Sequence, residues 1–317
     1  MEEVNSIILG LSHVGLTVKK LDESLKYYRE YFGFAVLSDA ERKGTWIEEI
    51  TGIPGFHTRT VYLSVTPYNH LELFGFFHPE TLPAEKETVP RVGISSCVFA
   101  REQLEGTSDL AEAGKVSRWS NQTGDIGEEP GRESRFVTLE DPNSLDLRIL
   151  EFRRKNAGSQ ESIGNNAFYP VFVVEDMASS LRFYQNILGL QTDGQGESLP
   201  EIDSLPEDKV DELVRWVLLT SPTGACLKLT QPLNTKILSA RPWRMERIGF
   251  THVGFAVKNL ERYYTELKGR GVNFKSSPQS VTVGPHKGGK VVYLSSPEGI
   301  TLEFVDSPLT FEQAPGK

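Results

Sequence analysis

The sequence has very little cysteine and no long apolar run. Its 317 residues include only Cys97 and Cys226, each within an apolar stretch typical of a strand. Small buried thiols in a reducing compartment explain this usage better than a disulfide framework does. The first residues, MEEVNSIILGLSHVGLTV, begin acidic, and Ser12 and His13 interrupt the apolar run that follows. This is neither a signal peptide nor a membrane span, so we expect a soluble, cytoplasmic protein.

The sequence also has fewer positively charged than negatively charged residues. The chain has 34 lysines and arginines against 43 aspartates and glutamates, which gives a formal net charge of −9 at pH 7. Such a charge is repelled by phosphate backbones, so neither nucleic acid nor a membrane surface is an expected partner. We expect instead a small-molecule substrate and a monomer or homodimer. The length favours two domains, each with its own core.

One unit recurs along the chain. A strand-like ILGLSHVGLTV precedes residues 21–32, where apolar residues recur at helical spacing, and Gly33 follows them. The same order is found in NAFYPVFVV before residues 177–189 and in FTHVGFAV before residues 260–271. A weaker copy starts with VGISSCVFA at residues 92–100. Internal repetition of this kind predicts a fold built from copies of one supersecondary unit.

Each unit then shows two or three strand-like runs and ends after a proline turn, as in VTPYNHLELF and SSPEGITLEF. The sequence therefore predicts an α+β fold of four β-α-β-β-β modules. A polar stretch at residues 153–165 lacks periodicity and is the expected linker between a domain at 1–155 and a domain at 166–306. The predicted modules span residues 7–77, 91–152, 166–232 and 248–306.

These motifs resemble the vicinal-oxygen-chelate superfamily, which includes glyoxalases, bleomycin-resistance proteins and extradiol dioxygenases. The resemblance rests on H-V-G-L-T-V, the amphipathic helix with its glycine, and the terminal P-x-G-x-x-L-E, and it covers nearly the whole chain. It implies two glyoxalase-like domains whose curved mixed sheets surround a cleft. It implies the reaction much less closely, because one fold hosts many chemistries.

In that superfamily, one metal ligand lies on the first strand of a module and another on its last strand. Alternation in SHVGLTV and THVGFAV places His13 and His252 opposite an apolar face, among small neighbours that leave room for a ligand. Aligning all four modules at the two ligand positions gives a His-Glu pair in the first and fourth only. The first-strand positions are His13, Ser95, Tyr169 and His252, and the last-strand positions are Glu72, Arg148, Lys228 and Glu303.

Two His-Glu pairs facing each other would supply two imidazoles and two carboxylates to one divalent ion. We therefore predict that modules one and four share a sheet and one metal cavity, whose ligands are His13, Glu72, His252 and Glu303. Modules two and three would form a second cavity without a metal. The competing interpretation treats these histidines as ordinary core residues, which fits a lone histidine better than two matched pairs.

The stretch GPHKGGKVVYLSSPEGITLEF is similar to the signature of extradiol ring-cleaving dioxygenases, from which it departs at Ser296. The resemblance implies that Glu303 is a ligand and that His286 and Tyr293 are catalytic groups close to the bound oxygens. An imidazole can shuttle a proton near neutral pH, and a phenol can donate a hydrogen bond to developing negative charge. For His286 a place in a glycine-rich loop, and for Tyr293 plain strand packing, are the alternatives.

Glu72 conflicts with that signature, because extradiol enzymes use two histidines and one carboxylate. A fourth ligand is the arrangement of glyoxalases and epimerases, in which a glutamate moves a proton. The first hypothesis is an Fe(II)-dependent dioxygenase, with dioxygen as co-substrate, that cleaves a hydroquinone- or catechol-like ring. The alternatives are a glyoxalase- or epimerase-type isomerase or lyase, with Mn, Ni, Co or Zn also able to bind, and a metal-free ligand-sequestering protein. We expect His57 and His70 to be loop and surface residues.

Overall fold

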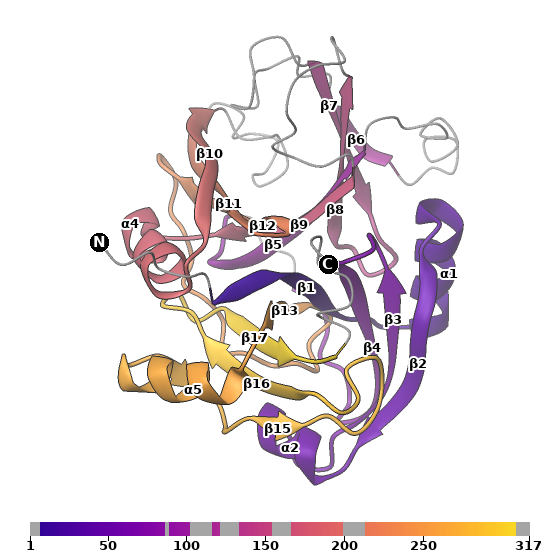
Figure 1. Cartoon of the computed structure of the whole chain (residues 1–317). Helices are drawn as coiled ribbons and strands as arrows, with labels where there is room; N and C mark the ends of the chain where they lie inside the picture. The colour runs from indigo at the N-terminus through magenta and orange to yellow at the C-terminus, as the bar shows by residue number, and fades with distance from the viewer. Residues whose placement is uncertain are drawn as a thin grey trace.

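Two large mixed sheets make up the protein (Figure 1). The computed structural model describes residues 7–85, 89–101, 116–120, 133–153, 166–198 and 213–308. The first sheet has nine strands, in the order β14 (Asn273–Phe274), β16 (Lys290–Ser295), β17 (Thr301–Asp306), β13 (Gly249–Val257), β1 (Ile8–Thr17), β4 (His70–His78), β3 (His57–Ser64) and β2 (Ala35–Lys43), with β15 (Gln279–Ser280) also paired to β16. The second sheet has eight, in the order β10 (Gln191–Ser198), β11 (Val214–Ser221), β12 (Gly224–Pro232), β9 (Asn166–Val173), β5 (Gly93–Arg101), β8 (Asp146–Arg153), β7 (Glu133–Glu140) and β6 (Val116–Ser120).

Each sheet is assembled from the two halves of the sequence. At the centre of the first sheet, β1 pairs antiparallel with β13, and each of them pairs in parallel with the last strand of its own module, β4 or β17. The second sheet repeats this plan with β5 and β9 at its centre and β8 and β12 beside them. The first sheet therefore combines modules one and four, and the second combines modules two and three. The α+β architecture expected from the sequence is confirmed.

A continuous apolar core fills the space between the two sheets. It takes the inward residues of the central strands, such as Val14, Leu16 and Phe99, because side chains alternate between the faces of a strand. The helices α1 (Leu21–Phe32), α4 (Met177–Leu181) and α5 (Leu260–Gly269), with the π-helical turn η1 (Arg182–Ile187), add their apolar faces to this core. Gly33 ends α1 in the left-handed region, with φ of 70°. None of the described helices is long and apolar enough to cross a membrane.

The opposite face of the first sheet is covered as well. The short helix α2 (Thr45–Thr51) lies beside β15 at one end of the molecule (Figure 1). A second apolar cluster joins α2 to this face of the sheet through Ile47, Ile50, Phe74, Met245 and Tyr293. The cover removes this face from water, so polar side chains that point into it are buried.

Candidate metal centre

On the two central strands of the first sheet, each histidine lies opposite a glycine of the other strand. In the antiparallel pairing of β1 with β13, His13 is opposite Gly254, and Gly15 is opposite His252. A Cβ atom on Gly254 would lie 2.2 Å from Cε1 of His13, and a Cβ on Gly15 would lie 2.2 Å from Cε1 of His252. The motif His-Val-Gly therefore supplies an imidazole and the space for the imidazole of the other module.

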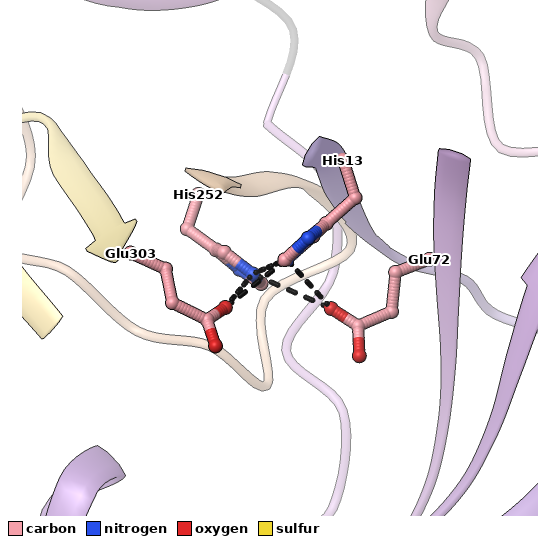
Figure 2. Close-up of side chains that lie close together, drawn as sticks. All are labelled: His13, Glu72, His252 and Glu303. Atoms are coloured by element: carbon pink, nitrogen blue, oxygen red, sulfur yellow. Dashed lines mark hydrogen bonds and ion pairs between the residues drawn. The ribbon is translucent and has the colours of Figure 1, made fainter. Parts of the chain in front are cut away.

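The terminal strands bring the two carboxylates to the same point (Figure 2). Glu72 on β4 is in register with Gly15, and Glu303 on β17 is in register with Gly254. The Nε2 atoms of His13 and His252 lie 3.0 Å apart. Oε2 of Glu303 is 3.0 Å from Nε2 of His13 and 2.9 Å from Nε2 of His252. Oε2 of Glu72 is 3.3 Å and 3.4 Å from the same two nitrogens.

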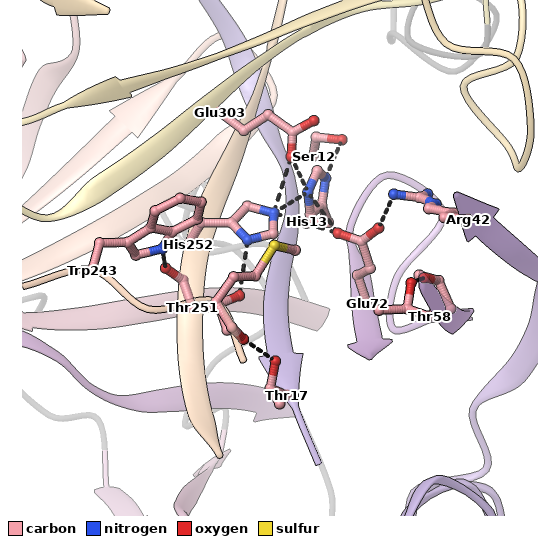
Figure 3. Close-up of polar contacts among 12 residues, drawn as sticks. Ser12, His13, Thr17, Arg42, Thr58, Glu72, Trp243, Thr251, His252 and Glu303 are labelled. Carbon is pink, nitrogen blue, oxygen red and sulfur yellow. Dashed lines mark hydrogen bonds and ion pairs between the residues drawn. The ribbon is translucent and has the colours of Figure 1, made fainter. Parts of the chain in front are cut away.

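The histidine rings are oriented by hydroxyl groups behind them (Figure 3). A hydrogen bond of 3.2 Å joins Nδ1 of His13 to Oγ of Ser12, and one of 2.9 Å joins Nδ1 of His252 to Oγ1 of Thr251. Trp243 donates in turn from Nε1 to the carbonyl oxygen of Thr251. These hydrogen bonds at Nδ1 hold each ring with its Nε2 directed to the centre. Histidines that bind metals are oriented in the same way, by a hydrogen bond at the nitrogen that does not bind the metal. A hydroxyl residue before each histidine, in SHVG and THVG, was an available sequence signal.

Arg42 is a member of the site that the sequence analysis missed. It lies on β2, is 7% exposed, and its Nη1 is 2.8 Å from Oε1 of Glu72 (Figure 3). Its guanidinium also stands over the ring of Tyr62, 5.3 Å from the centroid. Glu72 therefore directs one oxygen to the imidazoles and the other to a buried cation. In the sequence, the run ERKG around Arg42 is typical of a solvated strand end.

The ionisation of these groups reflects their mutual charges. Burial raises the pKa of Glu72, but Arg42 and His13 outweigh this effect and hold the pKa at about 2. Burial likewise opposes ionisation of Glu303, yet the two histidines keep its pKa well below the usual value. Burial alone would lower the pKa of His252, whereas Glu303 and Glu72 raise it to about 9. The metal-free centre thus holds two carboxylates and keeps a proton on His252.

The two candidate catalytic residues both lie next to the centre. His286 is 4% exposed, its ring is 5.9 Å from that of His13, and its Nδ1 is hydrogen-bonded to Oγ of Ser307 at 3.0 Å. Within the described part of the chain, its buried Nε2 has no hydrogen-bond partner. Burial and the charge of His13 lower the pKa of His286 to about 3, so the ring is neutral. The ring of Tyr293, on β16, is 5.1 Å from that of His252.

The other two histidines considered from the sequence differ from each other. His57 begins β3 and pairs with Glu41 at the protein surface, at 3.0 Å. His70 was expected in a loop or on the surface, which is wrong: it begins β4, in register with His13, and its Nδ1 is buried. Because His70 is two residues before Glu72 on the same strand, alternation places both on the covered face. Burial lowers the pKa of His70 to about 4.

The second sheet has different residues at the four equivalent positions. Strand registers equate Tyr169 with His252, Arg148 with Glu72 and Lys228 with Glu303. They equate Ser96, rather than Ser95, with His13, because Ser96 is opposite Val171 as His13 is opposite Gly254. The glycines are replaced as well, since Val98 and Val171 stand where Gly15 and Gly254 stand in the first sheet. The sequence alignment was therefore wrong by one residue at Ser95, where the pairing of β5 is irregular.

The four residues His13, Glu72, His252 and Glu303 fit a divalent ion. Their ligand atoms all lie within 4.8 Å of one another. Ligands at right angles, each ~2.1 Å from an ion, lie about 3.0 Å apart, close to the separations of 2.9 to 3.4 Å found here. Imidazole and carboxylate are the donors that Fe, Mn, Co, Ni and Zn accept. Among the described residues this is the one group of three or more histidine, cysteine or acidic side chains so arranged.

Comparison with protein families agrees with the repeated modules. The model of the Glyoxalase/Bleomycin resistance protein/Dioxygenase superfamily matches residues 10–141 and again residues 168–304. The two matches together span most of the chain. The chain belongs to this superfamily. The resemblance inferred from the sequence is thereby confirmed, and no curated protein sequence matches the chain.

Two solved structures share the fold over nearly the whole chain. Glyoxalase I from Zea mays has 14% sequence identity and a TM-score of 0.61, with 96% of this chain and 95% of that one covered. A putative dioxygenase from Bacillus subtilis subsp. subtilis str. 168 has 11% identity and a TM-score of 0.62, with 97% and 89% covered. At such identities the likeness shows the fold alone, and the two proteins differ in the chemistry that their names state.

Proposed function

We propose that the chain is a metal-dependent enzyme that binds a small molecule through two adjacent oxygens and moves a proton on it, as an isomerase or lyase. The position of Glu72 supports this proposal. Its Oε2 lies 3.3 and 3.4 Å from the two imidazole Nε2 atoms, nearly as close as Oε2 of Glu303. Four protein ligands leave an octahedral ion two positions, enough for two substrate oxygens and too few for dioxygen as well.

His13, Glu72, His252 and Glu303 would hold the ion. When bound, a divalent ion would act as a Lewis acid that polarises the substrate oxygens and stabilises negative charge on them. The protein removes this centre from water, because the four ligands are 0 to 5% exposed. Inside such a site, charges interact more strongly than they do in water.

His286 is our candidate for the group that moves the proton. If its Nδ1–H donates to Oγ of Ser307, its Nε2 keeps a free lone pair that can accept a proton, and the ring lies 5.9 Å from that of His13. Both oxygens of Glu72 are already engaged, one with Arg42 and the other with the imidazoles. Tyr293, beside His252, is our candidate for donating a hydrogen bond to the substrate.

Ring cleavage of a hydroquinone- or catechol-like aromatic is the second candidate, and Arg42 supports it. If Glu72 left the ion, its carboxylate would keep a buried ionic partner, since Nη1 of Arg42 is already 2.8 Å from Oε1. The centre would then have two histidines and one carboxylate, the set used by non-haem Fe(II) oxygenases. His286 and Tyr293 would flank the ring in this case too.

Hydrogen exchange and oxygen uptake distinguish the two candidates. The protein loaded with Co(II), Ni(II), Zn(II), Mn(II) or Fe(II) is incubated without oxygen in D₂O with a panel of α-hydroxy ketones and 2-hydroxy acids. Deuterium incorporation next to the chelating oxygens, followed by NMR, is expected with several of these metals. It should be lost in His286→Gln and kept in His57→Gln, a surface control. Oxygen uptake with catechols or hydroquinones, restricted to Fe(II) or Mn(II) and without anaerobic exchange, would contradict the proton-transfer proposal.

A further inference from the structure

The buried cation of Arg42 affects the net charge of the candidate metal centre. The inference drawn from this charge rests on the proposed function. Two carboxylates cancel the charge of a divalent ion, and the histidines that bind it are neutral. The guanidinium of Arg42 then leaves one positive charge in a site that is almost completely closed to solvent. We propose that Arg42 makes the centre select a substrate that binds as a monoanion, such as a 2-hydroxy or 2-oxo acid or a singly ionised diol.

The guanidinium is part of the centre rather than of the surface. It contacts Glu72 directly, and its charge also acts on Glu303 and on Tyr62. A Cβ on Gly284, in the loop that carries His286, would lie 3.3 Å from its Nη2, so Arg42 is enclosed between this loop and Glu72. Its Nε is buried and has no hydrogen-bond partner within the described residues.

No other buried charge of the described residues cancels that of Arg42. Glu246 is buried but forms its own ion pair with Arg244. Asp141 accepts a hydrogen bond from Tyr28, whose helix α1 packs in the core between the sheets. The remaining buried ions, Arg148 and Lys228, belong to the second sheet.

An uncompensated charge in such a site is unfavourable, so an anionic ligand gains affinity from it. A neutral chelator would leave the centre at one positive charge, whereas a monoanion would bring it to neutrality. An opposite charge ~4–6 Å away shifts an ionisation equilibrium by about 1–3 pKa units, a factor of about 10 to 1,000. Removing the charge of Arg42 should reduce the preference for a monoanion by a factor in this range.

A matched pair of probes tests this preference without any turnover. Glycolate and glycolamide each offer two vicinal oxygens, and they differ by one negative charge. Binding of each to the Co(II)-loaded protein is followed by the visible absorption of the cobalt, and cobalt content is measured in parallel. We expect the wild-type protein to bind glycolate at least ~10-fold more tightly than glycolamide, and Arg42→Met to lose at least ~10-fold of that ratio.

Further variants separate charge from positioning. Arg42→Lys should keep the preference, because it keeps the charge. Arg42→Met combined with Glu72→Gln removes one charge of each sign and should restore the preference. Arg59→Met is the matched control, because Arg59 is partly exposed on neighbouring β3 and pairs with Asp39 at 2.7 Å, away from the centre.

The following results would overturn the inference. An unchanged ratio in cobalt-loaded Arg42→Met would show that its charge does not select the ligand. Loss of cobalt from Arg42→Met would show that Arg42 acts only by holding Glu72. If the wild-type protein fails to take up Co(II) or to bind either probe, the proposed function fails as well. If it takes up Co(II) and binds both probes equally, the inference alone fails.

Discussion

Gly254→Ala should disrupt the candidate metal centre although it replaces none of the four ligands. The new Cβ would lie 2.2 Å from Cε1, 2.4 Å from Nδ1 and 2.7 Å from Nε2 of His13, all closer than real Cβ atoms approach a neighbour. The ring of His13 or the strand β13 has to move. Overpacking of this kind costs about 1–3 kcal/mol, which is about a 5- to 150-fold loss of metal affinity if the metal-bound conformation bears the whole cost.

Competition with a chromogenic chelator measures this change as the Kd for Co(II) or Zn(II). Thermal unfolding with and without metal gives a second readout, because an ion that binds only the folded state raises the Tm. Gly269→Ala is the control: nothing lies within 4 Å of its new Cβ, and the residue ends α5. The control should keep wild-type affinity and gain up to about 1 kcal/mol of stability. Wild-type affinity in Gly254→Ala would refute the packing argument.

Three further results are expected. Glu303→Ala should weaken Co(II) binding more than ~100-fold, whereas Thr251→Ala should weaken it by about 10- to 100-fold, because only the group behind the ligand is lost; equal effects would argue against these roles. Metal analysis should give one ion per chain, unchanged in Arg148→Met and Lys228→Met, and two ions in the wild-type protein would contradict this. The metal-free protein should lose stability as the pH rises from ~6.5 to about 9, because folding raises the pKa of His252 and its stabilising proton is lost in this window. Flat stability over this range would count against a charged His252.

Much of the architecture was predictable because the repeats are visible in the sequence. The apolar face of residues 21–32 and the glycine at position 33 define α1. Alternation along β1 places His13 on one face of the sheet and Val14 on the other. Helix α2 was not predicted, because its seven residues are too few for a clear helical period.

The site was predictable to the extent that it follows from strand alternation. Four side chains come together because equivalent positions of two modules lie on adjacent strands and on the same face of one sheet. They are His13, Glu72, His252 and Glu303. Arg42 could not be found this way, since it lies outside the repeated motif and packs against the loop of Gly284, which is far away in the sequence. The position of Ser96 depends on an irregular pairing within β5, which residue spacing does not show.

An anomalous difference map at the cobalt edge, from a crystal of the chain loaded with Co(II), tests the central claim most directly. The account predicts one peak per chain, with His13, Glu72, His252 and Glu303 all coordinated to it. A peak bound by the two histidines and Glu303 alone, with Glu72 turned to Arg42, would contradict the four-ligand centre and the proton-transfer function proposed from it. A peak on the second sheet, or none between these four residues, would contradict the site itself.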